Sequence, residues 1–538
     1  MAWAIAALVF GAYLALSLFR LFQLDPTSWD LGIYTEYVKQ LSLLHAPVVD
    51  VRGPGFDLLG DHFQVGLAVL APFFRVFPSP ATLLFFQALA TAVSVFPVVA
   101  AGSVLAGRTT GRLIGFGYGF SWGLQQMIEF DFHEIALAVP LLAFSLSALV
   151  RRRPAAAIWW AMPLVFLKED QGFTVAAIGA YLMVSGLRLR LAAALSGLRR
   201  RSRGSLGSRG SLGSRGSRGS LGSPGFLAAD AGDLAEYRYT ALWGGVFLVG
   251  WGLFWSVFAI TVVIPHFSAT HEYYYWKDGG VVGGGRAFSA FGLVAQTADG
   301  WPVKLQTVFL LLLPTAFAAL GSPAALLALP SLVLRFMSTN TAYWGTDWHY
   351  NATIMPILFV AAAEAIGRWQ RLSGSPSARA PARALTDTRP DLAGFASAAS
   401  ALAAWVALRR GVARHGPAMM AAVAVALAFQ FPLNDLWQSA TYRIDAHAQA
   451  ADAAMALVPD GATVQTTLGM LAPLAARTDT FWIGNAGNPL TQYVVFDNDD
   501  SGYSPAIKDV PAFIAAIYPN DGYAEIFQRD QVYVFRRS

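Results

Sequence analysis

Acidic, histidine and lysine side chains gather in a few short segments that lie between long apolar stretches of the sequence. Asp30 lies in "TSWDLGIY", and Asp61 and His62 lie in "GDHF". Lys168 begins the motif "KEDQG". A partly desolvated carboxylate can act as a general base on a hydroxyl group, and a nearby lysine can neutralise a phosphate leaving group. These residue types indicate group-transfer chemistry at the edge of a membrane.

The motif "KEDQG" and a further segment, "FDFHE", add more acids and a histidine. "FDFHE" contributes Asp131, His133 and Glu134, and "KEDQG" contributes Glu169 and Asp170. Such a set could hold a divalent metal such as Mg or Mn, which would also neutralise a phosphate, although "FDFHE" alone is too short and irregular for a metal motif. Each acid, taken singly, could instead cap a helix or be solvated. The gathering of several on one face favours a functional site.

The composition defines the class of protein that carries these segments. Hydrophobic residues make up 55% of the 538 residues and charged residues only 13%, as in a polytopic membrane protein. A net charge of +5, mostly in connecting segments, gives no reason to expect nucleic-acid binding. Cysteine is absent, which excludes disulfides, a thiolate nucleophile and cysteine metal ligands.

The apolar runs predict about 11 transmembrane helices, beginning with a retained N-terminal helix. The runs are 2–22, 80–106, 113–128, 135–150, 154–167, 171–187, 240–264, 303–320, 322–337, 351–367 and 416–433. The Lys/Arg-rich connections 107–112, 151–154, 188–218 and 368–414 belong on the cytoplasmic side. This orientation puts the N-terminus inside and the acidic and histidine-rich connections outside.

The same alternation sets the domain boundaries. Residues 1–437 are expected to form the membrane domain, with a first outer loop at about 23–79 in which 62–78 is a helix that lies at the outer surface or dips part-way into the membrane. A Gly/Ser/Arg insert at about 190–236 is expected to be disordered and cytoplasmic, and 368–415 to be a polar cytoplasmic segment. Within it, 394–409 either lies on the cytoplasmic face or forms an extra span. Residues 438–538 alternate short strands and helices and predict a small extracytoplasmic α/β domain.

Five motifs together resemble a known family. "WDLGIY", "GDHF", "DFHE", "KEDQG" and "DWHYNATIMPILF" resemble DUF2079, a bacterial family of polytopic membrane proteins of unknown function that is grouped with the GT-C integral-membrane glycosyltransferases. The likeness covers essentially the whole chain. It implies a GT-C-like fold in the bacterial inner membrane.

The resemblance also implies a reaction, the transfer of a hexosyl or pentosyl group from a polyprenyl-phosphate donor to an extracytoplasmic glycan, lipid or protein acceptor. By position, the role of catalytic base falls on Asp30, supported by Tyr34. Asp61, His62 and the "DFHE" residues Asp131, His133 and Glu134 would line the same cavity. Lys168 would bind the donor phosphate, with His349 from a later loop as a further candidate, and Glu169 and Asp170 would belong to the substrate-binding residues.

Two other functions fit the composition. A transporter or flippase of a lipid-linked intermediate would need polar residues near the middle of its spans, whereas polarity here is one-sided. A non-catalytic assembly protein would act through a partner bound to its exported tail. The one-sided polarity favours the enzyme.

Overall fold

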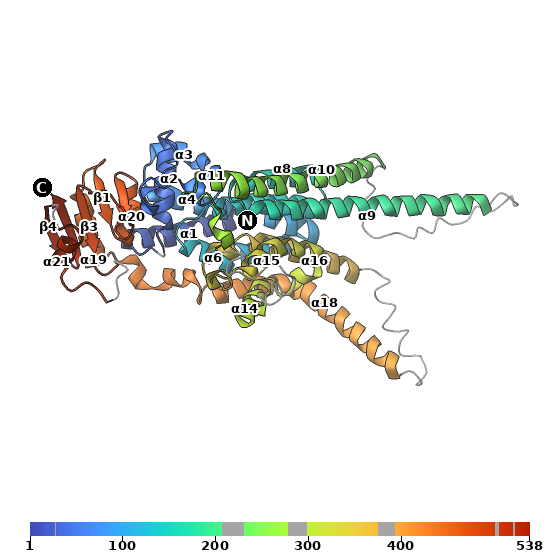
Figure 1. Cartoon of the computed structure of the whole chain (residues 1–538). Helices are drawn as coiled ribbons and strands as arrows, with labels where there is room; N and C mark the ends of the chain where they lie inside the picture. The colour runs from blue at the N-terminus through green and yellow to red at the C-terminus, as the bar shows by residue number, and fades with distance from the viewer. Residues whose placement is uncertain (27, 207–230, 278–297, 375–392, 501–504, 520–521) are drawn as a thin grey trace.

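The protein is mostly helical, with a small sheet domain at one end, in the computed structural model shown in Figure 1. The structure describes residues 1–538 except 27, 207–230, 278–297, 375–392, 501–504 and 520–521. The strands lie beside α2 (Asp30–Ser42) and α3 (Ala71–Val76). Two long helices, α9 (Gln171–Leu206) and α18 (Ala393–Leu427), reach away from the opposite end. The molecule is therefore elongated, with its sheet domain and its helical extensions at opposite ends.

Among the described residues, five helices are long and apolar enough to cross a membrane. They are Ala2–Gln23, Pro80–Ala106, Gln171–Leu191, Leu234–Phe267 and His349–Ser373. Four shorter apolar helices are Val65–Val76, Ile135–Val150, Pro154–Phe166 and Pro323–Met337. The expectation of a protein with several apolar helices is confirmed, and the count of about 11 stays a prediction.

The other elements of the helical part are short. They are η1 (Asp50–Arg52), η2 (Leu58–Gly60), η3 (Val65–Leu70), α5 (Arg108–Gly119), α6 (Trp122–Glu129), α7 (Ile135–Val150), α8 (Pro154–Ala161), η4 (Met162–Phe166), η5 (Ala259–Val263), α11 (Ile264–Phe267), α12 (Tyr274–Lys277), α14 (Trp301–Leu312), η6 (Leu313–Thr315), η7 (Ala318–Gly321), η8 (Pro323–Ala328), α15 (Leu329–Met337), η9 (Thr341–Tyr343) and η10 (His349–Asn351). The predicted spans at 303–320 and 322–337 are thus broken into short pieces. Proline residues begin several of these pieces, because proline lacks the N–H that would continue the preceding helix.

The core of the helical part is built on α1 (Ala2–Gln23), α4 (Pro80–Ala106) and α16 (Ile354–Gly374). Alanine and glycine let these helices approach closely. A Cβ atom on Gly367 of α16 would lie 2.3 Å from the carbonyl oxygen of Leu105 in α4. Small residues are the usual means of close helix packing in membranes.

A glycine stripe also joins α9 to α10 (Ala231–Phe258). A Cβ atom on Gly172 would lie 2.2 Å from the carbonyl oxygen of Gly252, and one on Gly179 would lie 2.7 Å from that of Gly245. Both contacts are with backbone, which cannot move aside as a side chain can. The stripe therefore fixes the start of α9, whose first two residues are the last two of the motif "KEDQG".

Gly252→Ala is expected to destabilise the protein, because the added methyl group would lie 2.3 Å from the carbonyl oxygen of Gly172. Overpacking of this kind costs about 1–3 kcal/mol. Gly250→Ala is the matched control in the same helix, since a Cβ atom there has no neighbour within 4 Å. Thermal unfolding in detergent should show a lower melting temperature for Gly252→Ala only. Equal melting temperatures for the two variants would contradict the close packing of α9 on α10.

One prediction about a polar segment is wrong in part, and a second polar segment is partly helical. The insert expected to be disordered at 190–236 is helical at both ends, because α9 continues to Leu206 and α10 begins at Ala231. Residues 207–230 lie outside the described part of the chain. The polar segment 368–415 is also helical at its ends, in α16 to Gly374 and in α18 from Ala393, and 375–392 are not described. Segment 394–409 is part of α18, which is long enough to cross a membrane but is not among the five described helices that are also apolar enough to do so.

The C-terminal domain is a five-stranded mixed sheet with the strand order β2-β1-β3-β5-β4. Its strands are β1 (Thr463–Thr466), β2 (Asp479–Trp482), β3 (Tyr493–Asp497), β4 (Tyr523–Arg529) and β5 (Val532–Arg537). β1 pairs in parallel with β2 and β3, and β5 pairs antiparallel with β3 and β4. Its helices are α19 (Ala446–Ala456), α20 (Leu468–Ala475) and α21 (Val510–Ile517), preceded by η12 (Pro432–Trp437) and η13 (Ser439–Tyr442). The small C-terminal sheet expected from the sequence is confirmed.

This domain packs directly on helix α2. Leu471 of α20 shares one buried cluster with Tyr34 and Tyr37 of α2. The ammonium group of Lys39 donates a hydrogen bond of 2.8 Å to the carbonyl oxygen of Thr478. Because α2 begins at Asp30, the C-terminal domain helps to hold the helix that carries this acid.

Candidate active site

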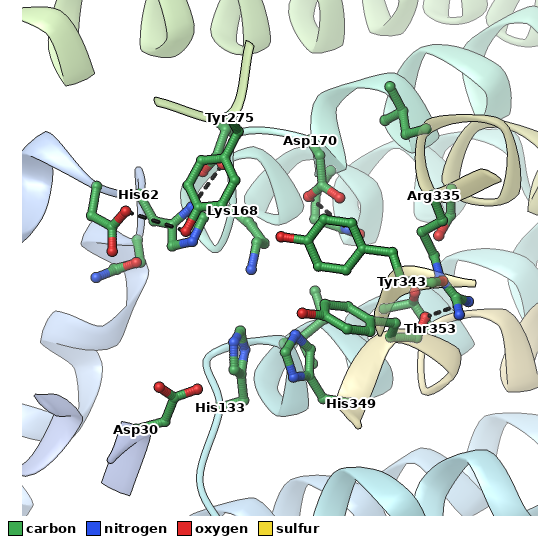
Figure 2. Close-up of a pocket in the computed structure, with 18 of the residues that line it drawn as sticks. Asp30, His62, His133, Lys168, Asp170, Tyr275, Arg335, Tyr343, His349 and Thr353 are labelled. Carbon is green, nitrogen blue, oxygen red and sulfur yellow. Dashed lines mark hydrogen bonds and ion pairs between the residues drawn. The ribbon is translucent and has the colours of Figure 1, made fainter. Parts of the chain in front are cut away.

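The acids and histidines singled out from the sequence meet at one cavity of about 370 Å³. Figure 2 shows side chains from several connections between helices pointing into it. Nine of the eleven candidate residues line the cavity, namely Asp30, Tyr34, Asp61, His62, His133, Lys168, Glu169, Asp170 and His349. They come from α2, the segment after η2, the connections before α7 and α9, and η10. The convergence of these connections is therefore a property of the fold, and the roles of the residues remain proposals.

Asp131 is one of the two candidates that do not line the cavity. It faces a smaller pocket between α1, α2 and α20. Its backbone has a φ of 65°, in the left-handed region that is uncommon for aspartate. Its carbonyl oxygen accepts a hydrogen bond from the Gln87 amide, and its carboxylate accepts one of 3.3 Å from the backbone N–H of Ser28. The expectation that Asp131 lines the cavity is wrong, because this backbone turn directs its side chain elsewhere.

Glu134 is the other exception, and it lies fully buried behind the cavity wall. The hydroxyl group of Tyr34 donates a hydrogen bond to it. The ammonium group of Lys168 lies 3.0 Å from one carboxylate oxygen, and Nδ1 of His133 lies 2.6 Å from the other. Glu134 thus touches three residues that line the cavity without reaching the cavity itself.

Electrostatics keep Glu134 charged. Burial alone would raise its pKa, but His133 and Lys168 hold that pKa well below its usual range. Burial would also lower the pKa of Lys168, yet Glu134 and the neighbouring acids raise it above its usual value. Burial lowers the pKa of His133 to about 4 despite Glu134, so its ring is neutral. The positive charge facing Glu134 is therefore that of Lys168.

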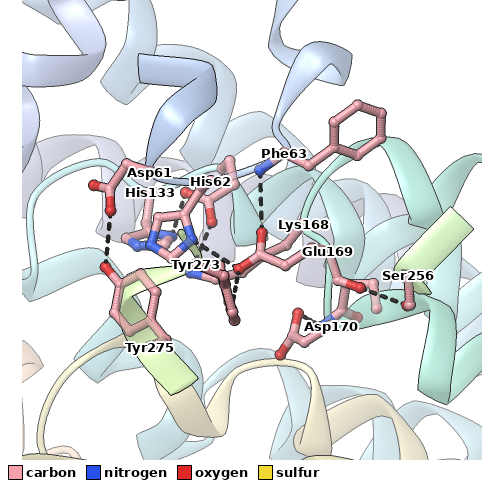
Figure 3. Close-up of polar contacts among 12 residues, drawn as sticks. Asp61, His62, Phe63, His133, Lys168, Glu169, Asp170, Ser256, Tyr273 and Tyr275 are labelled. Carbon is pink, nitrogen blue, oxygen red and sulfur yellow. Dashed lines mark hydrogen bonds and ion pairs between the residues drawn. The ribbon is translucent and has the colours of Figure 1, made fainter. Parts of the chain in front are cut away.

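Glu169 forms a second charged group with His62, shown in Figure 3. Nδ1 of His62 lies 2.8 Å from Oε1 of Glu169, and the hydroxyl group of Tyr273 donates to the same oxygen at 2.9 Å. The backbone N–H of Phe63 donates to Oε2 at 3.1 Å. Burial would raise the pKa of Glu169, but His62 lowers it to about 2. The carboxylate is fully occupied by these contacts, which tie the segment after η2 to the start of α9.

Asp61 is also paired. Its carboxylate lies 3.2 Å from the guanidinium group of Arg52 and accepts a hydrogen bond of 3.3 Å from the Tyr275 hydroxyl group. The Tyr275 ring stacks on His62 with 4.7 Å between ring centroids. Asp170 accepts a hydrogen bond of 3.1 Å from the side chain of Gln171.

Asp30 differs from these acids. It lies in the first turn of α2, and its backbone N–H donates to the Ser28 hydroxyl oxygen at 3.1 Å. Its carboxylate points into the cavity in Figure 2 and has no hydrogen bond or ion pair within the described part of the chain. Burial raises its pKa to about 7, and the negative charge of Glu134 adds to the rise. A half-buried carboxyl group with this pKa can accept a proton near neutral pH.

Arg335 is a cavity residue that the sequence analysis missed. Its guanidinium group is buried and donates to the carbonyl oxygens of Tyr343 and Gly345 and to the side-chain oxygen of Asn351, at 2.9, 3.1 and 2.8 Å. A single arginine within the apolar run 322–337 was the available signal, because charges in such segments are rare and usually functional. Arg52, Tyr275 and Tyr343, which also line the cavity, carry no comparable signal.

The donor set does not fit a divalent metal. The described residues contain no group of three histidine or acidic side chains arranged to hold one. Glu134, Glu169 and Asp61 each contact a cationic partner, so their oxygens are already occupied. The side chains of this cavity must therefore supply the charge and the proton acceptor themselves.

These features define a helical membrane protein with a polar cavity and a small C-terminal sheet domain. The chain belongs to the DUF2079 family of predicted membrane proteins, whose sequence profile matches residues 20–506. The family suggested by the five motifs is thereby confirmed. No curated protein sequence matches the chain.

Two solved structures resemble this one along almost their whole length. One is the crystal structure of ArnT from Cupriavidus metallidurans bound to undecaprenyl phosphate, with 13% sequence identity and a TM-score of 0.48, covering 98% of this chain and 97% of that chain. The other is the same protein in the apo state, with 14% identity and a TM-score of 0.43, covering 97% and 96%. Values this low give no information about the activity of the present protein.

Proposed function

We propose that the protein is a GT-C-type glycosyltransferase that transfers a sugar from a polyprenyl-phosphate donor to an acceptor outside the cytoplasm. The observation that carries this proposal is the unpaired carboxylate of Asp30 in a cavity that the cations Lys168 and Arg335 also line. Transfer of a sugar from a phosphate needs both a base for the acceptor and positive charge for the leaving group. The cavity supplies the two at once.

In this mechanism Asp30 takes the proton from an acceptor hydroxyl group. The hydroxyl oxygen forms a bond to the anomeric carbon, and the bond from that carbon to the phosphate oxygen breaks. The electron pair of the broken bond goes to the phosphate, which leaves as a polyprenyl phosphate monoester. Lys168 keeps further N–H donors besides the one facing Glu134, so it can bind the phosphate while its ion pair persists. Attack from the face opposite the phosphate inverts the anomeric centre.

The rest of the lining fits a lipid-linked sugar. Tyr275, Tyr343 and Tyr350 present aromatic rings and hydroxyl groups, which suit a sugar with apolar faces and polar edges. Phe173, Ile260 and Leu334 add an apolar side from α9, η5 and α15, which suits a prenyl chain. One cavity therefore offers surfaces for the three parts of such a donor.

The orientation proposed from the sequence is compatible with this site. The cavity residues come from the connections predicted to lie outside, whereas the arginine-rich parts of α9 and α18 extend from the other end of the molecule in Figure 1. We therefore place the membrane domain at 1–437 in the bacterial inner membrane, with the N-terminus inside. Residues 438–538 would form the extracytoplasmic domain.

The test uses the full chain reconstituted in vesicles with a panel of radiolabelled polyprenyl-phosphate sugars. We expect polyprenyl phosphate to be released faster than in vesicles without protein for at least one donor. Lys168→Met should lower that rate. Movement of intact donor between leaflets, with no breakage of the sugar–phosphate bond for any donor, would contradict the proposal and indicate a transporter.

A further inference from the structure

Two histidine rings stack on each other inside the cavity. The centroids of His133 and His349 lie 3.4 Å apart, with 22° between the ring planes, and Figure 2 shows both rings near Lys168. His349 is only 4% exposed, and neither of its ring nitrogens has a hydrogen-bond partner within the described part of the protein. A buried polar group without a partner is costly, so a ligand that supplies one would bind favourably here.

The charges around the cavity indicate what that ligand could be. Arg52, His62 and Lys168 each lie within 3.2 Å of a carboxylate. Arg335 differs among the described cavity cations, because its hydrogen-bond acceptors are carbonyl and amide oxygens and not carboxylates. Since no described carboxylate neutralises the guanidinium group of Arg335, this group can balance one negative charge on a ligand.

The proposed reaction changes the charge that this end of the cavity must hold. A donor with a phosphodiester carries one negative charge, and the monoester left after transfer carries nearly two at neutral pH. Arg335 can balance the first charge and not the second. His349, with two free nitrogens beside Lys168, is placed to supply the missing positive charge.

We propose that His349 takes up one proton when the cavity holds a phosphate monoester and stays neutral when it holds a phosphodiester. This inference rests on the proposed function. The protonated ring would donate an N–H to a phosphate oxygen, and His133 would remain neutral because two charged rings 3.4 Å apart repel each other. The acceptor hydroxyl group loses one proton in the transfer; when Asp30 has given up that proton and is again a carboxylate, and His349 holds one proton, the net charge of the complex is the same as before transfer.

Several charged or titratable groups face this pair and set the background for its titration. They are Glu134 beside His133, Lys168 before α9, Arg335 on α15, Tyr343 in η9, Tyr350 in η10 and Asp30 on α2. Asp30 is the competing proton acceptor, since its pKa lies near 7. An experiment on His349 must therefore remove Asp30 from the titration.

The test is calorimetric titration of the full chain in detergent at about pH 8, in the Asp30→Asn background, with farnesyl phosphate as monoester and methyl farnesyl phosphate as diester. Buffers of different ionisation enthalpy report the protons taken up on binding. We expect about one proton per monoester and none per diester. The dissociation constant of the monoester should rise about tenfold per pH unit above neutrality, as linkage to one proton requires.

Two variants identify the group that is protonated. His349→Phe keeps a ring for the stack and removes the nitrogens, and His349→Gln keeps a polar side chain that cannot be protonated. Both should abolish proton uptake while still binding the diester, which shows that they are folded. Proton uptake that persists in both His349 variants would place the proton on the lipid phosphate and overturn the inference. If the protein with the native His349 binds both lipids without proton uptake, the inference about His349 is overturned and the proposed transfer reaction still stands. If that protein binds neither lipid, the inference and the proposed function are both overturned.

Discussion

Replacing Asp30 by asparagine is expected to lower the rate of sugar transfer by about 100- to 10,000-fold, the usual contribution of a general base. The substitution keeps the size of the side chain and removes the group that accepts the proton. The measurement is single-turnover transfer in reconstituted vesicles with saturating donor. Asp25→Asn is the matched control, because Asp25 lies five residues before Asp30, pairs with Arg20 and does not line the cavity.

Stability distinguishes loss of the base from loss of the fold. The pKa of Asp30 is higher in the folded protein than in the unfolded chain, so the folded state binds more protons between about pH 4 and pH 7. The contribution of Asp30 to stability is therefore lost as the pH rises through this window. Asp30→Asn should melt at a higher temperature than the wild type at about pH 8, with a smaller difference at about pH 5. A variant that is inactive and also less stable at both pH values would not support the role of Asp30 as a base.

Glu134→Gln is expected to have the largest effect on stability, because it leaves the ammonium group of Lys168 buried beside a neutral amide. Breaking one partner of a buried ion pair costs about 3–5 kcal/mol. The change also removes the charge that lies 2.6 Å from His133 and 3.0 Å from Lys168, so activity should fall as well. Thermal unfolding and transfer should be measured on the same preparations.

Two further variants control for this result. Glu134→Gln combined with Lys168→Met should recover part of the lost stability, since no unpaired charge remains, and should stay inactive. Asp460→Asn breaks an exposed ion pair with Arg477 and should change the melting temperature little. If Glu134→Gln were as stable as Asp460→Asn, the buried ion pair would not have the role described here.

Most of the cavity could be predicted from the sequence because its residues lie at the ends of apolar runs. The alternation of basic and acidic connections predicts that these residues lie on one side of the membrane. Asp30, His62, Lys168 and His349 do meet at one cavity. Which side chain of a short connection enters the cavity depends on local backbone. Asp131 and His133 are two residues apart in "FDFHE", and the positive φ of Asp131 decides between them. No pattern in the sequence indicates that angle.

Other features depend on contacts between distant parts of the chain. Arg335 reaches the cavity because carbonyl groups of the segment 343–350 and Asn351 surround its guanidinium group. Glu134 lies behind the cavity wall, where the hydroxyl group of Tyr34 from helix α2 donates a hydrogen bond to it. The spans are harder to count. The region from α14 to α15 forms several short helices, whereas its two apolar runs, 303–320 and 322–337, suggested two spans. Hydropathy detects apolar segments and does not detect such breaks.

The most direct test of the account is the pH dependence of kcat/KM for transfer from the best donor of the panel. Since Asp30 must be ionised to accept a proton, we predict that kcat/KM rises about tenfold per pH unit below pH 7 and levels off above it. The residual rate of Asp30→Asn should lack this ionisation. A wild-type profile that is flat between about pH 5 and pH 8, or an unchanged profile in Asp30→Asn, would contradict the assignment of Asp30 as the base.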